Sequence, residues 1–262
     1  MKKFAILALL VCSVVQGQGQ KYDLLVQGAE NSELRPLLAA LEGRKRVSLA
    51  AWSYWAGTIG KKSVVISRTD IGPLNAAAST VLGIQRFRPG AILNQGTAGA
   101  HNPDLNVFDI VVGERTVDYG PVKSMPAPLG AGVDLKRWTR MRHKLRMDGR
   151  QLTEFDSFTG DAALMAAALA VPYSRGKVLK GTIGTAHQFN RELDKIVWTR
   201  QTFGTDTEDM ESAYVAGVAA AMKVPFLAIR IVSDSEYNHP AFERIAGEYC
   251  AEFVVEMIKR MK

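Results

Sequence analysis

Short runs of apolar and β-branched residues recur along this chain, and each run is bounded by glycine, proline or aspartate. Such runs are typical of buried strands. They cover residues 22–28, 61–67, 90–96, 109–113, 176–185 and 225–234. Helical patterns alternate with them, at about residues 31–42, 73–87, 160–170, 209–222 and 240–261. This alternation predicts an α/β fold with three α/β/α layers, in which helices cover both faces of a central mixed sheet.

The first residues have the pattern of a signal peptide. Two lysines follow Met1, residues 4–15 are apolar, and the polar segment "QGQGQ" comes next. This apolar run of about twelve residues is shorter than the roughly twenty that a membrane-spanning helix needs. We therefore predict that residues 1–19 are removed and that the protein is exported, periplasmic or secreted, with no membrane association afterwards. A lipoprotein attached through Cys12 is the alternative.

Residues 20–262 are long enough for a single α/β domain with its own core, and no low-complexity linker divides them. Cys250 is the only cysteine that remains after the predicted cleavage, so we expect no internal disulfide. No cysteine cluster suggests zinc, and we expect neither a metal ion nor a cofactor.

The formal net charge of +7 raises the question of an anionic partner. Basic residues concentrate in "DLKRWTRMRHKLRMDGR", residues 134–150. Such a run is more often a solvated helix face than a binding surface, and the chain has no recognisable nucleic-acid motif. We expect no nucleic-acid partner, and residues 134–150 remain a candidate segment for binding a small anion.

Polar or glycine-rich segments follow several of the predicted strands. In open α/β sheets ligands bind at the carboxyl ends of the strands, and glycine lets the backbone approach a ligand closely. The segments are "GAENSE" after residue 27, "NQGTAGA" from residue 94, "TAHQFN" from residue 185 and "SDSE" from residue 233. The sequence therefore predicts a small-molecule site where these segments converge.

Seven motifs occur in this order along the chain: "GAENSE", "IGPLNAA", "NQGTAGA", "DIVVGE", "HQF", "DMES" and "VPFLAIRIVSD". Together they resemble those of the nucleoside phosphorylase and nucleosidase superfamily, most closely its 5'-methylthioadenosine/S-adenosylhomocysteine nucleosidases. The resemblance extends over about residues 22 to 255. It implies a nucleoside phosphorylase-like fold, a nucleoside substrate and a homodimer.

The resemblance assigns the sugar to Met210 and Glu211. Glu211 would accept hydrogen bonds from the ribose 2' and 3' hydroxyls, which suits a carboxylate, and Met210 would pack under the ring. The alternative is that Glu211 is a helix N-terminal charge favoured by the macrodipole. We expect Glu208 and Asp209 to be acids of the first turn of the same helix.

The resemblance also assigns the chemistry. Asp234 would protonate the leaving purine near N7, with Ser233 orienting the carboxyl group; the alternative is a cap at the end of a strand. Glu33 would activate water, which Thr97 and Arg230 would help to hold; the alternative is a solvated acid at a helix start. The arginines that clamp phosphate in the family's phosphorylases are missing from "LNQGTAG" and "GAENSEL".

The resemblance assigns the base to the loop "AHQFN" and to the glycine-rich strand end. Phe189 would stack on the purine, the Asn190 backbone would read its edge, and Gly99 would line the same side. An aspartate at position 234 goes with adenine in the family. At the 5' end of the nucleoside, Glu30 stands where the family often has a methionine, and His239 and Phe242 are expected nearby. Residues 118 to 160 are expected to form a lid or to reach the site of a neighbouring subunit.

Three functions remain open on this basis. The first is an exported purine nucleosidase that hydrolyses adenine nucleosides of the methylthioadenosine or adenosylhomocysteine type. The second is a phosphorylase, or a nucleosidase for a phosphorylated nucleoside. The third is a non-catalytic purine-binding protein, because one fold can serve many functions.

Overall fold

This computed structural model describes residues 21–147, 149 and 151–261. The predicted signal peptide, residues 1–19, lies outside the described residues, so its cleavage and the export of the protein stay predictions. Among the helices of the described residues, none combines the length and the apolar character that crossing a membrane requires.

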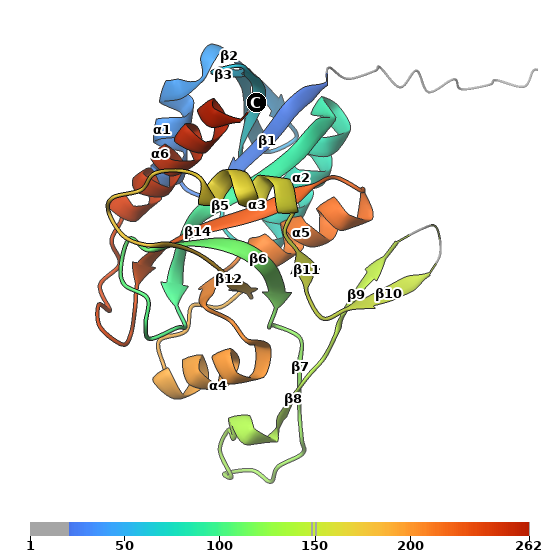
Figure 1. Ribbon diagram of the computed structural model, residues 1–262. Helices are drawn as coiled ribbons and strands as arrows, with labels where there is room; N and C mark the ends of the chain where they lie inside the picture. Colours follow the sequence, from blue (N-terminus) through green and yellow to red (C-terminus); the bar gives the residue numbers. More distant parts are fainter. Residues whose placement is uncertain (1–20, 148, 150, 262) are drawn as a thin grey trace, which may run out of the picture.

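A ten-stranded mixed sheet forms the centre of the molecule (Figure 1). Its order is β11-β6-β12-β13-β5-β1-β4-β3-β2, and β14 pairs with both β5 and β6. Strands β5, β14, β6, β12 and β13 therefore close on themselves, while β1 to β4 extend the sheet to one side. The strands are β1 (Tyr22–Gly28), β2 (Glu42–Leu49), β3 (Trp52–Ile59), β4 (Lys62–Arg68), β5 (Pro89–Ala100), β6 (Ile110–Asp118), β11 (Phe158–Thr159), β12 (Val178–Thr185), β13 (Thr207–Asp209) and β14 (Phe226–Asp234).

Helices cover both faces of this sheet, which confirms the predicted α/β/α layers. Two pack together on one face, α1 (Asn31–Ala40) and α6 (Ile245–Arg260), with α3 (Ala162–Leu169) beside α6. On the other face α2 (Pro73–Phe87) packs against α5 (Ser212–Ala221). A further helix, α4 (Leu193–Phe203), was not predicted from the sequence.

The central strands are buried on both faces. In β1, Leu24 and Val26 belong to the core beneath α1 and α6, while Leu25 belongs to the core beneath α2 and α5. Successive side chains of a strand point to opposite faces. Because both faces are covered, these strands read as continuous apolar runs, which is why the sequence revealed them.

The described residues between 119 and 157 extend from the body as two antiparallel ribbons, which we call the hairpin arm (Figure 1). One ribbon pairs β7 (Val122–Ser124) with β8 (Trp138–Arg140), and the other pairs β9 (His143–Arg146) with β10 (Leu152–Phe155). A short 3-10 turn, η1 (Leu135–Arg137), precedes β8. The expectation that the basic run is a helix face was therefore wrong for its described part.

Candidate active site

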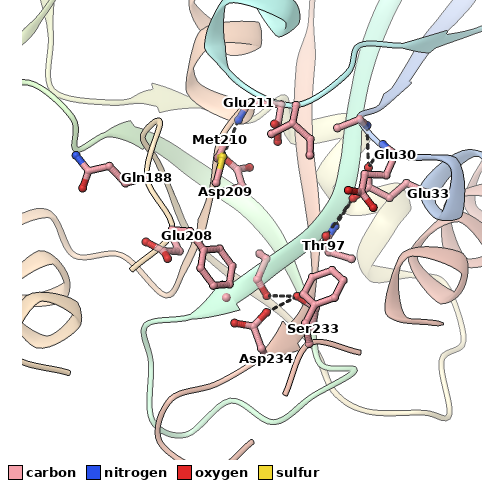
Figure 2. A pocket seen from close by; sticks show the side chains of 16 residues that line it. Glu30, Glu33, Thr97, Gln188, Glu208, Asp209, Met210, Glu211, Ser233 and Asp234 are labelled. Atoms are coloured by element: carbon pink, nitrogen blue, oxygen red, sulfur yellow. Dashed lines mark hydrogen bonds between the residues drawn. The ribbon is translucent and has the colours of Figure 1, made fainter. Parts of the chain in front are cut away.

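One cavity opens where the carboxyl ends of β1, β5, β13 and β14 meet (Figure 2). The space between its walls, counted together with the part open to solvent, is about 690 Å³. All four polar segments that were predicted to converge contribute to its wall. The predicted site residues that line it are Glu33, Thr97, Gly99, Phe189, Met210, Glu211, Ser233 and Asp234.

The Glu33 carboxylate is buried at the start of α1 and is held by four donors. Its Oε2 accepts from the backbone amides of Ala29, at 2.7 Å, and Glu30, at 3.0 Å. Its Oε1 accepts from the backbone amide of Thr97, at 2.9 Å, and from the Thr97 hydroxyl, at 3.1 Å. Gly96 is required beside it, because a Cβ there would lie 2.6 Å from Glu33 Oε1. Glu33 is therefore a helix-start residue, but not a solvated one.

Asp234 ends β14 on another wall of the cavity. The Ser233 hydroxyl lies 2.7 Å from Asp234 Oδ1 and 3.2 Å from the carbonyl oxygen of Ala98. Burial raises the pKa of the Asp234 carboxyl, an effect that the Ser233 hydrogen bond opposes and the negative charge of Glu208 reinforces. A carboxyl in this setting holds its proton more readily than an exposed one.

Glu211 immediately precedes α5. Its Oε1 accepts from the backbone amide of Gly72 at 2.8 Å. Burial, and next the nearby charge of Asp209, raise the pKa of Glu211 to about 7, against the opposing effect of the Arg230 guanidinium. Met210 lines the cavity next to it, so the two residues predicted to hold the sugar lie together.

Arg230 lies behind the cavity wall and does not belong to the lining. Its side chain is almost completely buried, with Nε 2.6 Å from Asp209 Oδ2 and a terminal nitrogen 2.5 Å from Asn94 Oδ1. The same guanidinium approaches Glu211 Oε2 at 3.8 Å. It therefore neutralises the acids under the sugar side of the cavity, and its role in holding water stays a prediction.

The expectation that Glu208 and Asp209 are first-turn acids was wrong. The predicted helix 209–222 begins only at Ser212, and both acids lie in the short strand β13. Each is buried, with exposed fractions of 6%, and Glu208 lines the cavity. Glu208 was not predicted from the sequence to belong to the site.

Asn190 differs from the expectation as well. Its backbone amide, which was expected to face the purine, donates to Glu208 Oε1 at 2.9 Å. Its side chain also turns to Glu208 and to the hydroxyl of Tyr119. The neighbouring Phe189 ring lines the cavity and is 55% exposed, which leaves its face open for a stacked base.

A second hollow adjoins the cavity, because Ala29, Glu30 and Ile71 line both. It is bordered by six charged residues, three basic and three acidic: Glu30, Arg35, Arg68, Asp70, Arg244 and Glu248. Of the two residues expected near the 5' end, Phe242 lines the cavity, whereas the His239 ring bonds Glu243 at 3.0 Å. Within the described part of the chain, no group of three or more histidines, cysteines and acids is placed to hold a metal ion.

Known proteins are similar in sequence to this chain over nearly their whole length. Two 5'-methylthioadenosine/S-adenosylhomocysteine nucleosidases, from Bacillus licheniformis and Bacillus subtilis, are 29% and 28% identical to this chain. Each alignment covers 91% of this chain and 99% of the relative.

Solved structures show the same fold. The nucleosidase of Neisseria meningitidis in complex with methylthio-immucillin-A superposes with a TM-score of 0.73 and is 25% identical, over 91% of this chain and 99% of that one. The 5'-methylthioadenosine/S-adenosylhomocysteine nucleosidase of Campylobacter jejuni superposes with a TM-score of 0.72 and is 25% identical, over 92% of this chain and 100% of that one. The family model of the phosphorylase superfamily matches residues 23–259. Because that match takes in the sheet, its covering helices and every wall of the cavity, the chain belongs to the phosphorylase superfamily.

Proposed function

We propose that this protein hydrolyses the N-glycosidic bond of adenine nucleosides of the 5'-methylthioadenosine/S-adenosylhomocysteine type, releasing free base and free sugar. The observation that carries the proposal is that one cavity holds Glu33, Glu211 and Asp234 in three different environments. Separate environments give carboxyl groups separate roles in one reaction. The names of the similar nucleosidases support the adenine base and the 5'-thio substituent.

Asp234 serves the leaving group. When the glycosidic bond breaks, its electrons pass to the purine, which leaves more readily once N7 carries a proton. The raised pKa of Asp234 favours the protonated form that can supply it, and Ser233 fixes Oδ1. The other carboxyl oxygen of Asp234, Oδ2, lies beside Gly99 at the cavity wall, and a Cβ at Gly99 would be 3.3 Å from it. Glycine at this position leaves room for the base.

Glu33 serves the attacking water. As the water oxygen bonds to the anomeric carbon, one of its protons passes to Glu33, while the proton of Asp234 leaves with the base. Among the four donors that hold Glu33, the Thr97 hydroxyl can rotate to share its hydrogen bonds with a water molecule, whereas the three amides cannot. Exchange of one proton through solvent then restores both carboxyl groups.

Glu211 and Met210 serve the sugar. One oxygen of Glu211 is fixed by the Gly72 amide, and a carboxylate can accept from two neighbouring hydroxyls at once. Burial raises the pKa of Glu211 to about 7, and the Arg230 guanidinium limits this rise, so the ionised form that accepts predominates above that pKa. Ribose is thus gripped close to both the water and the leaving base.

The rate of base release is expected to be the same with and without phosphate. Phosphate as a nucleophile needs cationic clamps, and the cavity lining among the described residues contains neither arginine nor lysine. The measurement is an incubation of methylthioadenosine, adenosylhomocysteine, adenosine and inosine in buffers with and without phosphate, reading free base, free sugar and sugar 1-phosphate. Sugar 1-phosphate as the main product would establish a phosphorylase, and binding without release of any base would establish a purine-binding protein.

The basic segment gives the phosphorylated-nucleoside alternative little support. Across the ribbon of β9 and β10, Lys144 lies 3.2 Å from Glu154, and Arg142 lies 3.3 Å from Asp156. These partners reduce the local positive charge. The lining of the cavity includes no residue of the hairpin arm.

We also propose that the protein is a homodimer, and we expect it to sediment as one at micromolar concentration. Most residues of helix α5 are buried in the core, so this helix offers little surface for the contact. The hairpin arm instead exposes large apolar side chains that a second copy would cover. They are Met125, Leu129, Val133, Met141 and Leu152. Sedimentation velocity tests this, and a monomer at that concentration would contradict it.

A further inference from the structure

We propose that Glu208 recognises the base: its Oε1 accepts a hydrogen bond from an N–H group on the six-membered-ring edge of the bound purine. This inference rests on the proposed function, because it requires a purine in the cavity. It starts from a buried acid that lines the cavity and that the hydrolytic roles leave unused.

The surroundings of Glu208 hold it as a carboxylate in one orientation. Its Oε2 accepts three hydrogen bonds, from His101 Nε2 at 3.0 Å, the Tyr119 hydroxyl at 2.6 Å and Asn190 Nδ2 at 2.5 Å. Burial alone would raise the pKa of Glu208, but these partners, His101 above all, lower it on balance. The group is therefore charged and cannot donate.

The second oxygen has acceptor capacity to spare. Within the described chain, Oε1 accepts a hydrogen bond from the Asn190 backbone amide at 2.9 Å. A carboxylate oxygen can accept at least two hydrogen bonds, and Oε2 of the same group accepts three. Because Oε2 is fully occupied, the free capacity of this buried charge lies on Oε1.

Strand pairing brings Oε1 beside the proposed general acid. Both β13 and β14 pair with β5 at Gly99, so Glu208 and Asp234 flank the same glycine. A Cβ at Gly99 would lie 3.3 Å from Asp234 Oδ2 and 3.8 Å from Glu208 Oε1. Figure 2 shows the two acids on neighbouring parts of the cavity wall. In a purine, the C6 substituent and then N1 follow N7 along one edge, so a base with N7 at Asp234 presents this edge to Glu208.

The chemistry of a carboxylate restricts what that edge can be. It only accepts, so the facing group must carry a hydrogen: the 6-amino group of adenine, or the N1–H of a 6-oxopurine. The backbone amide of Asn190, the donor that would suit the bare N1 of adenine, is already engaged by Glu208. A base with no N–H at this edge would leave the charge without a partner.

The test compares nucleosides that share one 5' group and differ only in the base: adenine, hypoxanthine and purine without a 6-substituent. The free energy of a hydrogen bond to a charged group corresponds to a change in kcat/KM of about 10- to 150-fold. We expect wild-type kcat/KM to favour a base that carries the donor over unsubstituted purine by this factor. Whether adenine or hypoxanthine is the better substrate identifies the donor as the 6-amino group or N1–H.

Glu208→Gln should remove this preference. The three donors at Oε2 will hold the amide oxygen there, which turns the amide NH₂ toward the base and replaces an acceptor by a donor. The kcat/KM ratio between the donor-bearing base and unsubstituted purine is expected to fall to about one or below. Tyr119→Phe is the matched control, because it loosens the same cluster but leaves Oε1 as an acceptor; it should slow all substrates alike and preserve the ratio.

The outcomes separate this inference from the proposed function. If Glu208→Gln lowers kcat/KM for every nucleoside by the same factor, Glu208 is structural only and the inference fails while the hydrolase stands. If the wild-type protein releases no base at all, the proposed function fails. Should the variant not fold, binding of free adenine, hypoxanthine and purine to the wild-type protein decides the question: equal affinities would overturn the inference.

Discussion

Asp234→Asn is expected to lower kcat by about a hundredfold to ten-thousandfold, the usual worth of general acid catalysis, with little change in KM. Asparagine keeps the shape of the side chain and can still bond Ser233, but it has no proton to transfer. The interaction with N7 strengthens only as the glycosidic bond breaks, so its loss appears in kcat rather than in binding.

Steady-state kinetics on methylthioadenosine and adenosylhomocysteine check this prediction. Glu236→Gln is the matched control, since Glu236 lies two residues away and pairs with Arg191 outside the cavity; its turnover should stay close to that of the wild-type protein. The pH profile gives a second measurement. Burial raises the pKa of Asp234, so kcat should fall as pH rises through that pKa, and this limb should be missing in Asp234→Asn. A hundredfold loss of kcat in Glu236→Gln would show that any nearby substitution disturbs the site, and the prediction for Asp234 would then be contradicted.

The sequence predicted the parts of the fold that repeat a simple pattern. Strands β1, β5 and β14 are buried on both faces, and their apolar runs stand out from the surrounding chain. Because parallel strands end at one edge, Glu33, Thr97 and Asp234 could be expected to meet, and they line one cavity. The hairpin of β2 and β3 was missed because the first five residues of β2, in "EGRKRV", are all exposed and show no alternation.

Glu208 shows what the sequence could not reveal. In "TDTEDMES" the acids precede an apolar helical stretch and read as helix-start charges, which the macrodipole favours. Strand β13 has only three residues, too few to show a period of two. The partners that make Glu208 a fixed, buried carboxylate are His101, Tyr119 and Asn190, and the first two lie about a hundred residues away in the chain. Only the closure of the sheet brings them together.

Glu33→Gln is expected to lower kcat by about a hundredfold or more, because an amide cannot take a proton from water. A second effect is predicted from the geometry. The carboxylate accepts from four donors, and an amide would turn its NH₂ group toward two of them. The variant should therefore also unfold at a lower temperature, since buried donors lose their acceptor.

Two measurements distinguish the lost proton transfer from a damaged site. The affinity for free adenine should stay close to wild type, because Glu33 lies at the water side of the cavity while the base is bound near Asp234. Glu252→Gln, which makes the same chemical change at a surface pair with Arg175, should alter neither turnover nor melting temperature. If the affinity for adenine falls by as large a factor as kcat, the substitution has damaged the binding site and has not only removed the general base. If both Glu33→Gln and Asp234→Asn keep nearly wild-type turnover, neither carboxyl group moves a proton in the rate-limiting step, and the hydrolytic mechanism proposed for this cavity is wrong.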